Sequence, residues 1–360
     1  MDQRELARLR FQHQRLLSSP FSRAADAVQW LGAVQSQDYE GARWAVGLRS
    51  AGLDDAAVEA ACDAGDILRT HLMRPTWHFV AAEDLRWMLA LTAPRLKHRL
   101  ETADRKIGLD EEIYARCNAV MERALRDGAQ LTRQELAAAL RQGGMEPGGV
   151  QRLAHIVIRA EQDGILCSGA RRGKQMTYAL LHERVKASRQ LSGDEALAEL
   201  ARRYFRSHGP ATLADFGWWA WLPAAEARRG LDLARAQFQS ADLDGKTCWY
   251  AEEAAEAFAS PAAYLLPNFD EVVGSYKDHR PSVDPRYWAE WESYYTLFTH
   301  HLLIDGLIVG GWKRLPKKAG REVQIRLFGR LTGAEEEAVL AAAGRYERFL
   351  DCRVTVTWAK

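Results

Sequence analysis

The sequence lacks an apolar stretch near the ~20 residues that a membrane-spanning helix requires, and its first residues lack a secretory signal pattern. Its five cysteines are scattered, odd in number and contain no CxxC pair. A disulfide framework or a zinc site is therefore not expected, and a reducing compartment fits. These absences predict a cytoplasmic protein with no membrane association and no metal.

A strong net charge is also missing, because the formal charge at pH 7 is only +1. Nucleic-acid binding would therefore depend on local clusters of basic residues. Three clusters occur; each alone is equally typical of a solvated face, whereas the three together favour a phosphate-binding surface. They are residues 313–330, with seven basic side chains and one acid; 95–106, with Arg95, Lys97, Arg99, Arg105 and Lys106; and 171–174, with Arg171, Arg172 and Lys174.

The order of elements typical of a winged helix, three helices and then a hairpin, is present in the middle of the sequence. Apolar residues at helical spacing predict a helix over 113–125. Thr132 and Glu135 carry the signature of a capping box at the start of a second helix. A third helix is predicted over 150–162, before a hairpin over 165–180 with a basic tip.

The same order recurs further along the chain, which indicates internal repeats. A second threonine cap, Thr212 with Asp215, lies 80 positions after Thr132. A third and looser copy contains larger insertions. The second copy has predicted helices at 195–207 and 224–237 and a hairpin at 238–250, and the looser copy has a recognition-type helix at 23–34 and a hairpin at 67–80.

The last hundred residues predict a different arrangement. An Asp-Gly turn at 305–306 joins two apolar strands, and a second hairpin with a basic tip, a helix and a strand follow. We predict a mainly α fold with β (α+β): three tandem winged-helix units and a C-terminal α+β domain forming a C-shaped, concave DNA-binding cleft. The predicted boundaries are 1–104 for the unit with the catalytic motif, 105–190, 191–258, and 259–360 for the domain with the basic hairpin.

Two glutamines, Gln35 and Gln37, follow the apolar helix predicted to end at Val34. They would face different directions in a helix and the same direction in an extended segment. Carboxamides cannot act as a general base at neutral pH, but they can hold and orient a water molecule. That suffices when the leaving group departs readily, as an N7-alkylated purine does. Hydrogen bonding of both glutamines to a helix end remains the alternative.

Five stretches carry a resemblance to a known family. They are 31–38 (LGAVQSQD), 68–80 (LRTHLMRPTWHFV), 209–219 (GPATLADFGWW), 265–271 (LLPNFDE) and 305–312 (DGLIVGGW). Together they resemble the AlkZ-type family of winged-helix DNA glycosylases, over nearly the whole chain. The resemblance implies hydrolysis of the N-glycosidic bond of damaged purines in DNA.

The catalytic motif of this family is glutamine, an aliphatic residue and glutamine, which implies catalytic roles for Gln35 and Gln37. Ser36 departs from the pattern and leaves both amides in place. The YcaQ-like branch has aspartate at the second position. Gln37 therefore makes this chain more similar to the azinomycin-resistance branch, which is associated with bulky and crosslinking lesions.

Other residues are candidates for support of the site. Arg74, Thr76 and His78 fit the Arg-x-Thr-x-His run of the family, although a lone histidine on a strand is more often structural. Asp38 places a carboxylate beside the glutamines, although capping of the following turn is the simpler role. A carboxylate pair at 270–271 is similar to a glycosidase site, but in this family that stretch is chiefly structural.

DNA contacts are expected at two hairpin tips, although a solvated turn would have the same composition. The twelve tryptophans, including those at 218, 219 and 221, are expected to pack in the core rather than to stack on bases. The residues expected to bind DNA are Arg171, Arg172 and Lys174 at the first tip and Lys317, Lys318 and Arg321 at the second.

The sequence thus predicts a monofunctional DNA glycosylase that leaves an abasic site. Its expected partner is double-stranded DNA carrying N7-alkylated purines, such as bulky natural-product adducts or interstrand crosslinks, as in antibiotic self-resistance. No cofactor is implied, and a monomer is expected. The alternative is a non-catalytic winged-helix DNA-binding regulator, although such proteins typically have one winged helix per chain. An RNA- or protein-binding scaffold is a third possibility, which predicts no preference for damaged duplex.

Overall fold

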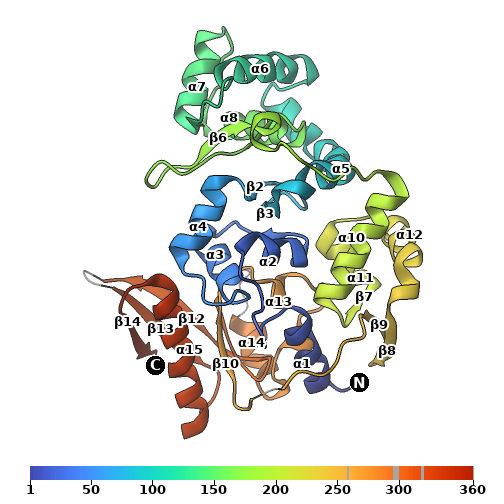
Figure 1. Ribbon diagram of the computed structural model, residues 1–360, viewed down its shortest axis with the longest axis vertical. Helices are drawn as coiled ribbons and strands as arrows, with labels where there is room; N and C mark the ends of the chain where they lie inside the picture. The colour runs from blue at the N-terminus through green and yellow to red at the C-terminus, as the bar shows by residue number, and fades with distance from the viewer. Residues whose placement is uncertain (258, 295–299, 318–319, 360) are drawn as a thin grey trace. The chain divides into compact units, whose positions relative to one another are not determined.

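The computed structural model describes residues 1–257, 259–294, 300–317 and 320–359. The chain forms two compact units, one of residues 1–59 and 198–360 and the other of residues 60–197 (Figure 1). Both contain helices and strands, so the predicted α+β class is confirmed. This division into two units does not test the four predicted domains, because each unit is larger than one winged helix. The four domains therefore remain a prediction.

In the unit of residues 60–197, the end of a helix over 55–64 is followed by an antiparallel hairpin and a long helix: β2 (Ile67–His71), β3 (Trp77–Ala81), η1 (Ala82–Asp84) and α5 (Leu85–Lys106). The predicted order of three helices and a hairpin follows. Apolar side chains of these helices, among them Met121, Leu136 and Ile156, form one buried core. The elements are α6 (Glu111–Ala124), β4 (Leu131–Thr132), α7 (Arg133–Gln142), α8 (Val150–Gln162), β5 (Leu166–Ser168), β6 (Thr177–Leu180) and α9 (Leu181–Arg184).

The second predicted copy has the same strand order. Its sheet runs β7-β9-β8, as the first runs β4-β6-β5, so in each the short strand before the capped helix pairs with the last strand. Thr132 and Thr212 both form the predicted capping boxes. Interpretation of the copies as winged helices remains a prediction. The second copy comprises α10 (Gly193–His208), β7 (Ala211–Thr212), α11 (Leu213–Ala220), α12 (Ala224–Ala234), η2 (Arg235–Gln237), β8 (Gln239–Leu243) and β9 (Lys246–Tyr250).

The N-terminal segment contains α1 (Gln3–His13), α2 (Ala24–Leu31), the short strand β1 (Val34–Gln35), α3 (Tyr39–Gly47) and α4 (Asp55–Ala64). The helix predicted over 23–34 is too long. It ends at Leu31, because Gly32 takes a φ of 81° that stops the helix. The backbone is extended three residues later, at Gln35.

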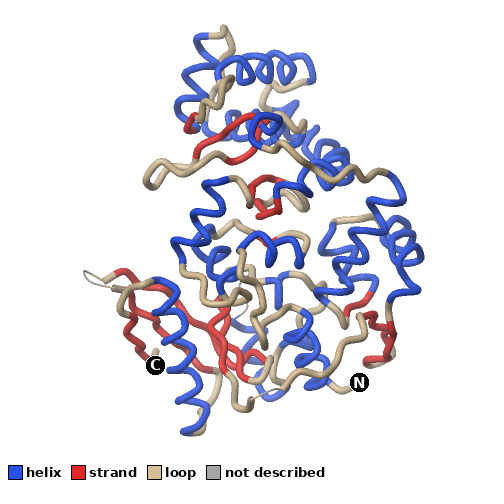
Figure 2. Tube along the Cα trace, viewed as in Figure 1, coloured by secondary structure: helices blue, strands red, loops and turns tan. Residues whose placement is uncertain are grey.

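The C-terminal part confirms the predicted hairpins, helix and strand. Its five-stranded sheet has the order β10-β11-β12-β13-β14, with the last pair parallel, and the hairpin turn is at Asp305 and Gly306. Figure 2 shows α15 beside these strands, and its contacts with the sheet include β10 and β14. The elements are β10 (Ala263–Leu266), α13 (Glu271–Gly274), η3 (Arg280–Ser282), η4 (Pro285–Tyr287), α14 (Trp288–Tyr294), β11 (His300–Ile304), β12 (Leu307–Pro316), β13 (Arg321–Leu327), α15 (Gly333–Leu350) and β14 (Val354–Trp358).

The tryptophan prediction is only partly right. Trp219 is 1% exposed and packs against Tyr204 and His208, as expected for a core residue. Trp218 is 43% exposed, because adjacent helical residues lie about 100° apart and only one of the two can face the core. Core packing was therefore the wrong expectation for Trp218.

Helix α3 packs closely on α15. The Trp44 ring centroid lies 4.9 Å from that of Phe349 and 5.0 Å from that of Tyr346, and Trp44 Nε1 donates to the carbonyl of Leu265 at 2.7 Å. At Gly47 a Cβ atom would lie 2.4 Å from the Phe349 ring. The close approach of these two helices therefore requires glycine at this position.

Replacing Gly47 with alanine is expected to lower the free energy of unfolding by about 1–3 kcal/mol, because the ring of Phe349 and the helices must move apart. Urea denaturation measures the loss. Gly333→Ala is the control, since a Cβ there meets nothing within 4 Å. Equal stability of the two variants would contradict the requirement for glycine at the helix contact.

Candidate active site

The two candidate catalytic glutamines lie in the extended segment between α2 and α3. Gln35 is in β1 and is only 8% exposed, whereas Gln37 is exposed. Neither residue caps α2, whose C-cap is Gly32. The backbone N–H of Gln35 donates to Oε1 of Glu271 at 2.9 Å. The segment is thus held by a residue 236 positions later in the chain.

Asp38 follows the glutamines and caps α3, as its simpler role predicted. Its Oδ1 accepts the N–H of Gly41 at 3.1 Å, and its Oδ2 forms an ion pair with Arg314 of β12. Burial opposes the charge of Asp38, but the hydrogen bond and charge of Arg314 outweigh it and lower the pKa. The segment of the glutamines is therefore tied to the C-terminal sheet at its downstream end.

Replacing Asp38 with asparagine is expected to lower the free energy of unfolding by about 1 kcal/mol at pH 7, since the cap and ion pair both weaken. The folded-state pKa of Asp38 lies below its unfolded value of about 3.9. The stabilisation is therefore complete above that value and disappears as the pH falls through the folded pKa. Urea denaturation should show that Asp38→Asn has a lower free energy of unfolding than wild type at pH 7. The difference between the two proteins should be smaller at pH 3.

The control for this comparison is Asp278→Asn, because Asp278 pairs with Lys246 at an exposed site. Its effect at pH 7 should be smaller. A difference between Asp38→Asn and wild type that grew on acidification would contradict the assignment.

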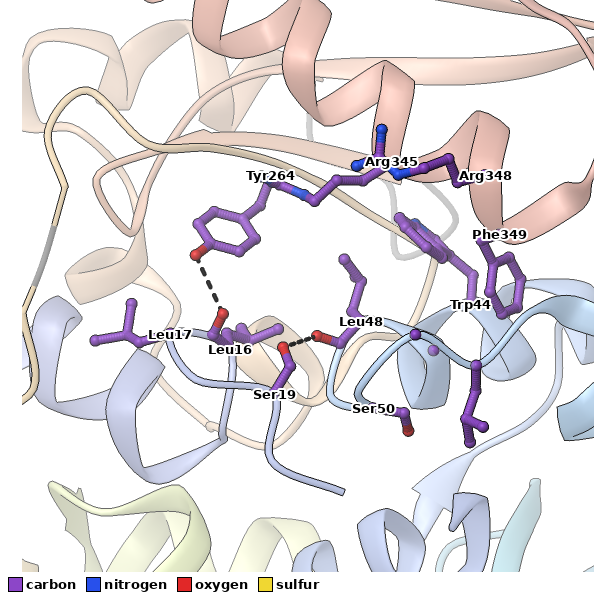
Figure 3. A pocket seen from close by; sticks show the side chains of 13 residues that line it. Leu16, Leu17, Ser19, Trp44, Leu48, Ser50, Tyr264, Arg345, Arg348 and Phe349 are labelled. Carbon is purple, nitrogen blue, oxygen red and sulfur yellow. Dashed lines mark hydrogen bonds between the residues drawn. The ribbon is translucent and has the colours of Figure 1, made fainter. Parts of the chain in front are cut away.

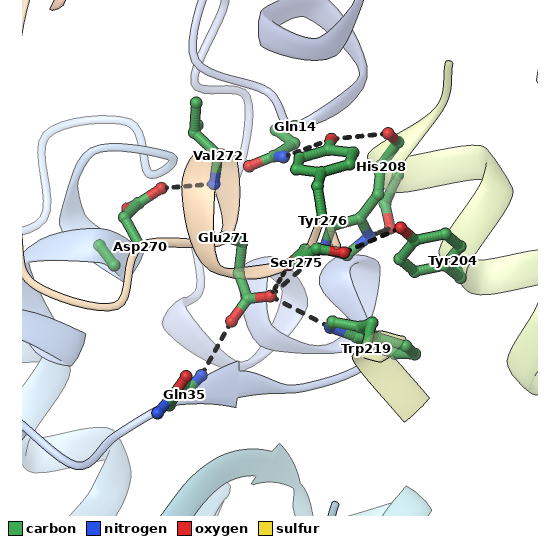
Figure 4. A network of polar contacts seen from close by, with 12 residues as sticks. Gln14, Gln35, Tyr204, His208, Trp219, Asp270, Glu271, Val272, Ser275 and Tyr276 are labelled. Atoms are coloured by element: carbon green, nitrogen blue, oxygen red, sulfur yellow. Dashed lines mark hydrogen bonds and ion pairs between the residues drawn. The ribbon is translucent and has the colours of Figure 1, made fainter. Parts of the chain in front are cut away.

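Glu271 is the centre of a buried polar network (Figure 4). Oε1 accepts the N–H of Gln35, and Oε2 accepts Nε1 of Trp219 at 3.1 Å and the hydroxyl of Ser275. His208 Nε2 lies 3.5 Å from the same Oε2. The carboxylate thus lies between the backbone of β1 and side chains from α10, α11 and the end of α13.

The ionisation of this network follows from its contacts. Burial raises the pKa of Glu271, but His208, Ser275 and the N–H of Gln35 overcome this and lower it to about 2. Burial, with help from the nearby charge of Arg49, lowers the pKa of His208 in spite of Glu271. At neutral pH Glu271 is therefore a carboxylate next to an uncharged imidazole.

The neighbouring carboxylate, Asp270, has a separate partner. Arg49 donates to its two oxygens at 2.9 and 3.0 Å, and both side chains are fully buried. Arg49 also donates to Gln14 Oε1 at 2.7 Å, and Gln14 donates to the hydroxyl of Tyr276 at 3.1 Å. This chain of contacts fixes α13 against α1 and the end of α3, so the acidic pair at 270–271 has no glycosidase-like arrangement.

The other predicted support residues belong to the β2–β3 hairpin of the unit 60–197. Arg74 lies in the turn with a φ of 51°, and the N–H of Thr76 donates to its carbonyl at 2.8 Å. His78 is 1% exposed on β3, and its Nδ1 lies 3.0 Å from the carbonyl oxygen of Thr76. The three residues are thus neighbours within this hairpin, and a role for them in the reaction stays a prediction.

The basic tip at 171–174 is partly neutralised. Arg172 pairs with Glu135 at 2.7 Å, and its other amino group donates to the carbonyl of Gln130. Arg171 is half-buried with its N–H on Asp63, and Lys174 is exposed. Arg172 therefore stabilises its own unit in addition to any contact with DNA.

At the second basic tip, part of the positive charge is likewise paired with acidic side chains. Lys317 lies 3.3 Å from Glu322, and Arg321 is half-buried. Lys318 lies outside the described residues. Arg314, from the same basic cluster, forms an ion pair with Asp38. DNA binding by the residues at this tip remains a prediction.

A pocket of about 390 Å³ lies at the other end of α3 from the glutamines (Figure 3). Leu16, Leu48 and the rings of Trp44 and Phe349 line it, with Arg345 and Arg348 of α15. Neither candidate glutamine is among its lining residues. This pocket is therefore separate from the candidate site.

Within residues 1–257, 259–294, 300–317 and 320–359, no three His, Cys, Asp or Glu side chains are grouped so that they could hold a metal ion. The helices in these ranges include none long and apolar enough to span a bilayer.

Comparison with known proteins identifies the family. The model of the family described as DNA glycosylase AlkZ-like matches residues 28–349. The chain belongs to the DNA glycosylase AlkZ-like family. As a member, it is a DNA glycosylase, a hydrolase of N-glycosyl bonds whose substrate is DNA.

Two relatives from Streptomyces sahachiroi are similar to this AlkZ-like chain. The interstrand DNA cross-link repair glycosylase is 26% identical over 340 residues, which cover 86% of this chain and 87% of the relative. The solved structure of DNA glycosylase AlkZ matches with a TM-score of 0.81 and 23% identity over 100% of both chains. This second match confirms the fold.

Sequence reasoning missed two residues that hold the segment of the glutamines. Glu271 was identified only as part of a structural stretch, and Arg314 only as one of seven basic residues in a cluster. The available signals were indirect: Glu271 ends one of the five stretches of resemblance, and Arg314 follows another by two residues. Nothing in the spacing indicated that either would contact residues 35–38 of this AlkZ-like protein.

Proposed function

We propose that the protein hydrolyses the N-glycosidic bond of N7-alkylated purines in double-stranded DNA and leaves an abasic site. Bulky natural-product adducts and interstrand crosslinks are the proposed lesions. The relative named an interstrand DNA cross-link repair glycosylase supports this choice. We expect the enzyme to act as a monomer in the cytoplasm, with DNA contacts at the basic tips 171–174 and 317–321.

The observation that carries the proposal is the fixed position of Gln35 and Gln37. The backbone of Gln35 is bonded to Glu271, Asp38 is tied to Arg314, and the side chain of Gln37 is exposed. A carboxamide on a rigid surface segment can hold a water molecule in one orientation. This arrangement favours a role in orienting water over a flexible contact with DNA.

The reaction requires these two residues mainly to position the attacking water molecule. An N7-alkylated purine carries a positive charge and departs as a neutral base, so the leaving group needs no general acid. The two carboxamides would accept hydrogen bonds from one water molecule and direct its lone pair at C1′ of the sugar. As the C1′–O bond forms, the C1′–N bond to the purine breaks, and the surplus proton of the water passes to bulk solvent. Because extrusion of a bulky or crosslinked base would be costly, we propose that the nucleotide remains stacked or shifts only partly.

The test is incubation of the protein with duplexes that contain one 7-methylguanine, one bulky N7-guanine adduct or one N7 crosslink. Release of the free base, with strands that break only after alkali, is the expected result. Covalent trapping by borohydride is not expected, because no lysine Schiff base forms. Failure to release any of the three bases above the spontaneous rate would overturn the proposal, and strand breakage without alkali would overturn its monofunctional part.

A further inference from the structure

We infer that Glu271 is a positioning residue for this hydrolysis, which fixes Gln35 and keeps a negative charge beneath the sugar that reacts. The inference rests on the proposed function and assigns a role to a side chain that does not touch the substrate. It is carried by the contacts of the two carboxylate oxygens, by the charges around them and by the charge that the reaction develops.

Both oxygens of Glu271 are committed to fixed donors. Oε1 accepts from the backbone of Gln35 at 2.9 Å, and Oε2 accepts from Trp219 and Ser275. The side chain is 1% exposed, so water does not compete for these positions. A carboxylate held in this way acts as an anchor for β1 and cannot take a proton from the attacking water.

The carboxamide of Gln35 also lies against the helix of Glu271. A Cβ atom at Gly274 would lie 3.9 Å from Oε1 of Gln35, which places the amide beside the last turn of α13. Both the backbone and the side chain of Gln35 are therefore positioned by the segment 271–274.

The charges around Glu271 leave its negative charge unbalanced. Arg49 and Asp270 neutralise each other through two hydrogen bonds, and burial keeps His208 uncharged at neutral pH. Trp219 and Ser275 are neutral donors. These six side chains together carry a net charge of about −1 behind Gln35, and the two other buried charges that act on the neighbouring Tyr276, Arg10 and Asp215, are of opposite sign.

This charge has the sign that the reaction requires. As the bond to the purine breaks, positive charge develops on the sugar ring, and neutral carboxamides do little to stabilise it. The path from Glu271 to C1′ runs along the side chain of Gln35, through the water that it holds and across the contact between that water and the sugar. These lengths place the carboxylate about 10 Å from C1′. At an effective dielectric constant near 20, the attraction over that distance corresponds to roughly a tenfold change in rate.

The experiment compares the binding of two substrate analogues that cannot be hydrolysed. One duplex carries a pyrrolidine in place of a deoxyribose, with a ring nitrogen that is protonated at neutral pH. The other carries an uncharged tetrahydrofuran at the same position. The ratio of their dissociation constants measures how strongly the protein favours positive charge on the ring, and base release from 7-methylguanine DNA is measured in parallel.

Three variants separate charge from position. Glu271→Gln keeps an acceptor for Gln35 and removes the charge, so the preference for pyrrolidine and the rate of base release should each fall about tenfold. Glu271→Asp keeps the charge and withdraws the oxygens, so the preference should persist while base release falls at least about tenfold. Gln35→Ala should abolish base release and retain the preference.

Asp215→Asn is the matched control, because Asp215 is a second buried carboxylate, 3% exposed, whose oxygens accept the N–H groups of Lys277 and Thr212, both at 2.9 Å. It should retain the preference for pyrrolidine. If Glu271→Gln does not fold, Glu271→Asp and Gln35→Ala still test the inference, since it requires both to retain the preference and a loss in Gln35→Ala would overturn it.

Two results would overturn the inference: an unchanged preference in Glu271→Gln, or a loss of preference in Gln35→Ala, which would place the effect in the carboxamide. Either result leaves the proposed function intact if the wild type releases base. Absence of base release by the wild type is the failure of the proposed function, and the binding ratio still reports on Glu271 by itself.

Discussion

Replacing Gln35 or Gln37 with alanine is expected to lower the rate of base release from 7-methylguanine DNA by at least about a hundredfold. Removal of either carboxamide leaves the water with one hydrogen-bonding partner instead of two, so its orientation at C1′ is lost. Binding of the same duplex should change less than about threefold, because phosphate contacts supply most of the affinity. Single-turnover kinetics and a binding titration at fixed salt give the two numbers.

Gln190→Ala is the control for this pair, since Gln190 is an exposed glutamine whose side chain donates to Ser188, two residues earlier in its own segment. It should match the wild type in both measurements. Rates for Gln35→Ala and Gln37→Ala that equal the wild-type rate, with DNA binding retained, would remove the catalytic role of the motif and favour a DNA-binding protein.

Asp270→Ala is expected to have the largest effect on stability, about 3–5 kcal/mol. It leaves the guanidinium of Arg49 without a counter-charge in a position that is 0% exposed. The bond from Arg49 to Gln14 cannot replace a carboxylate, because a neutral amide oxygen does not balance the charge. Urea denaturation measures the loss in free energy of unfolding.

The double variant Arg49→Met, Asp270→Ala tests the cause. Because the buried charge is removed together with its partner, we expect it to recover at least half of the stability lost by Asp270→Ala alone. A double variant less stable than Asp270→Ala would mean that packing around these side chains, rather than their charges, determines the effect.

Local patterns in the sequence predicted much of the fold. The capping boxes at Thr132 and Thr212 and the turn at Asp305 and Gly306 all depend on residues within a few positions of one another. Helix α8 begins and ends where its apolar spacing predicts. The end of α2 was missed although Gly32, a typical helix stop, was visible in the sequence.

The contacts that hold the candidate site could not be predicted in the same way. Gln35 and Glu271 are 236 positions apart, and Asp38 and Arg314 are 276 positions apart. Hydrophobic periodicity and turn signals describe neighbours along the chain, and neither indicates which distant carboxylate or guanidinium will meet a given segment. The pair Gln35 and Gln37 was found through its resemblance to a family motif, which does not depend on such contacts.

The bond between Gln35 and Glu271 has a consequence for synthesis. During translation the two glutamines leave the ribosome long before residues 265–276 are synthesised. The N-terminal part therefore cannot complete its polar network alone. Until then Arg49 lacks its counter-ion and β1 lacks its acceptor. Nascent or prematurely terminated polypeptides that end before Glu271 would therefore be inert toward the genome.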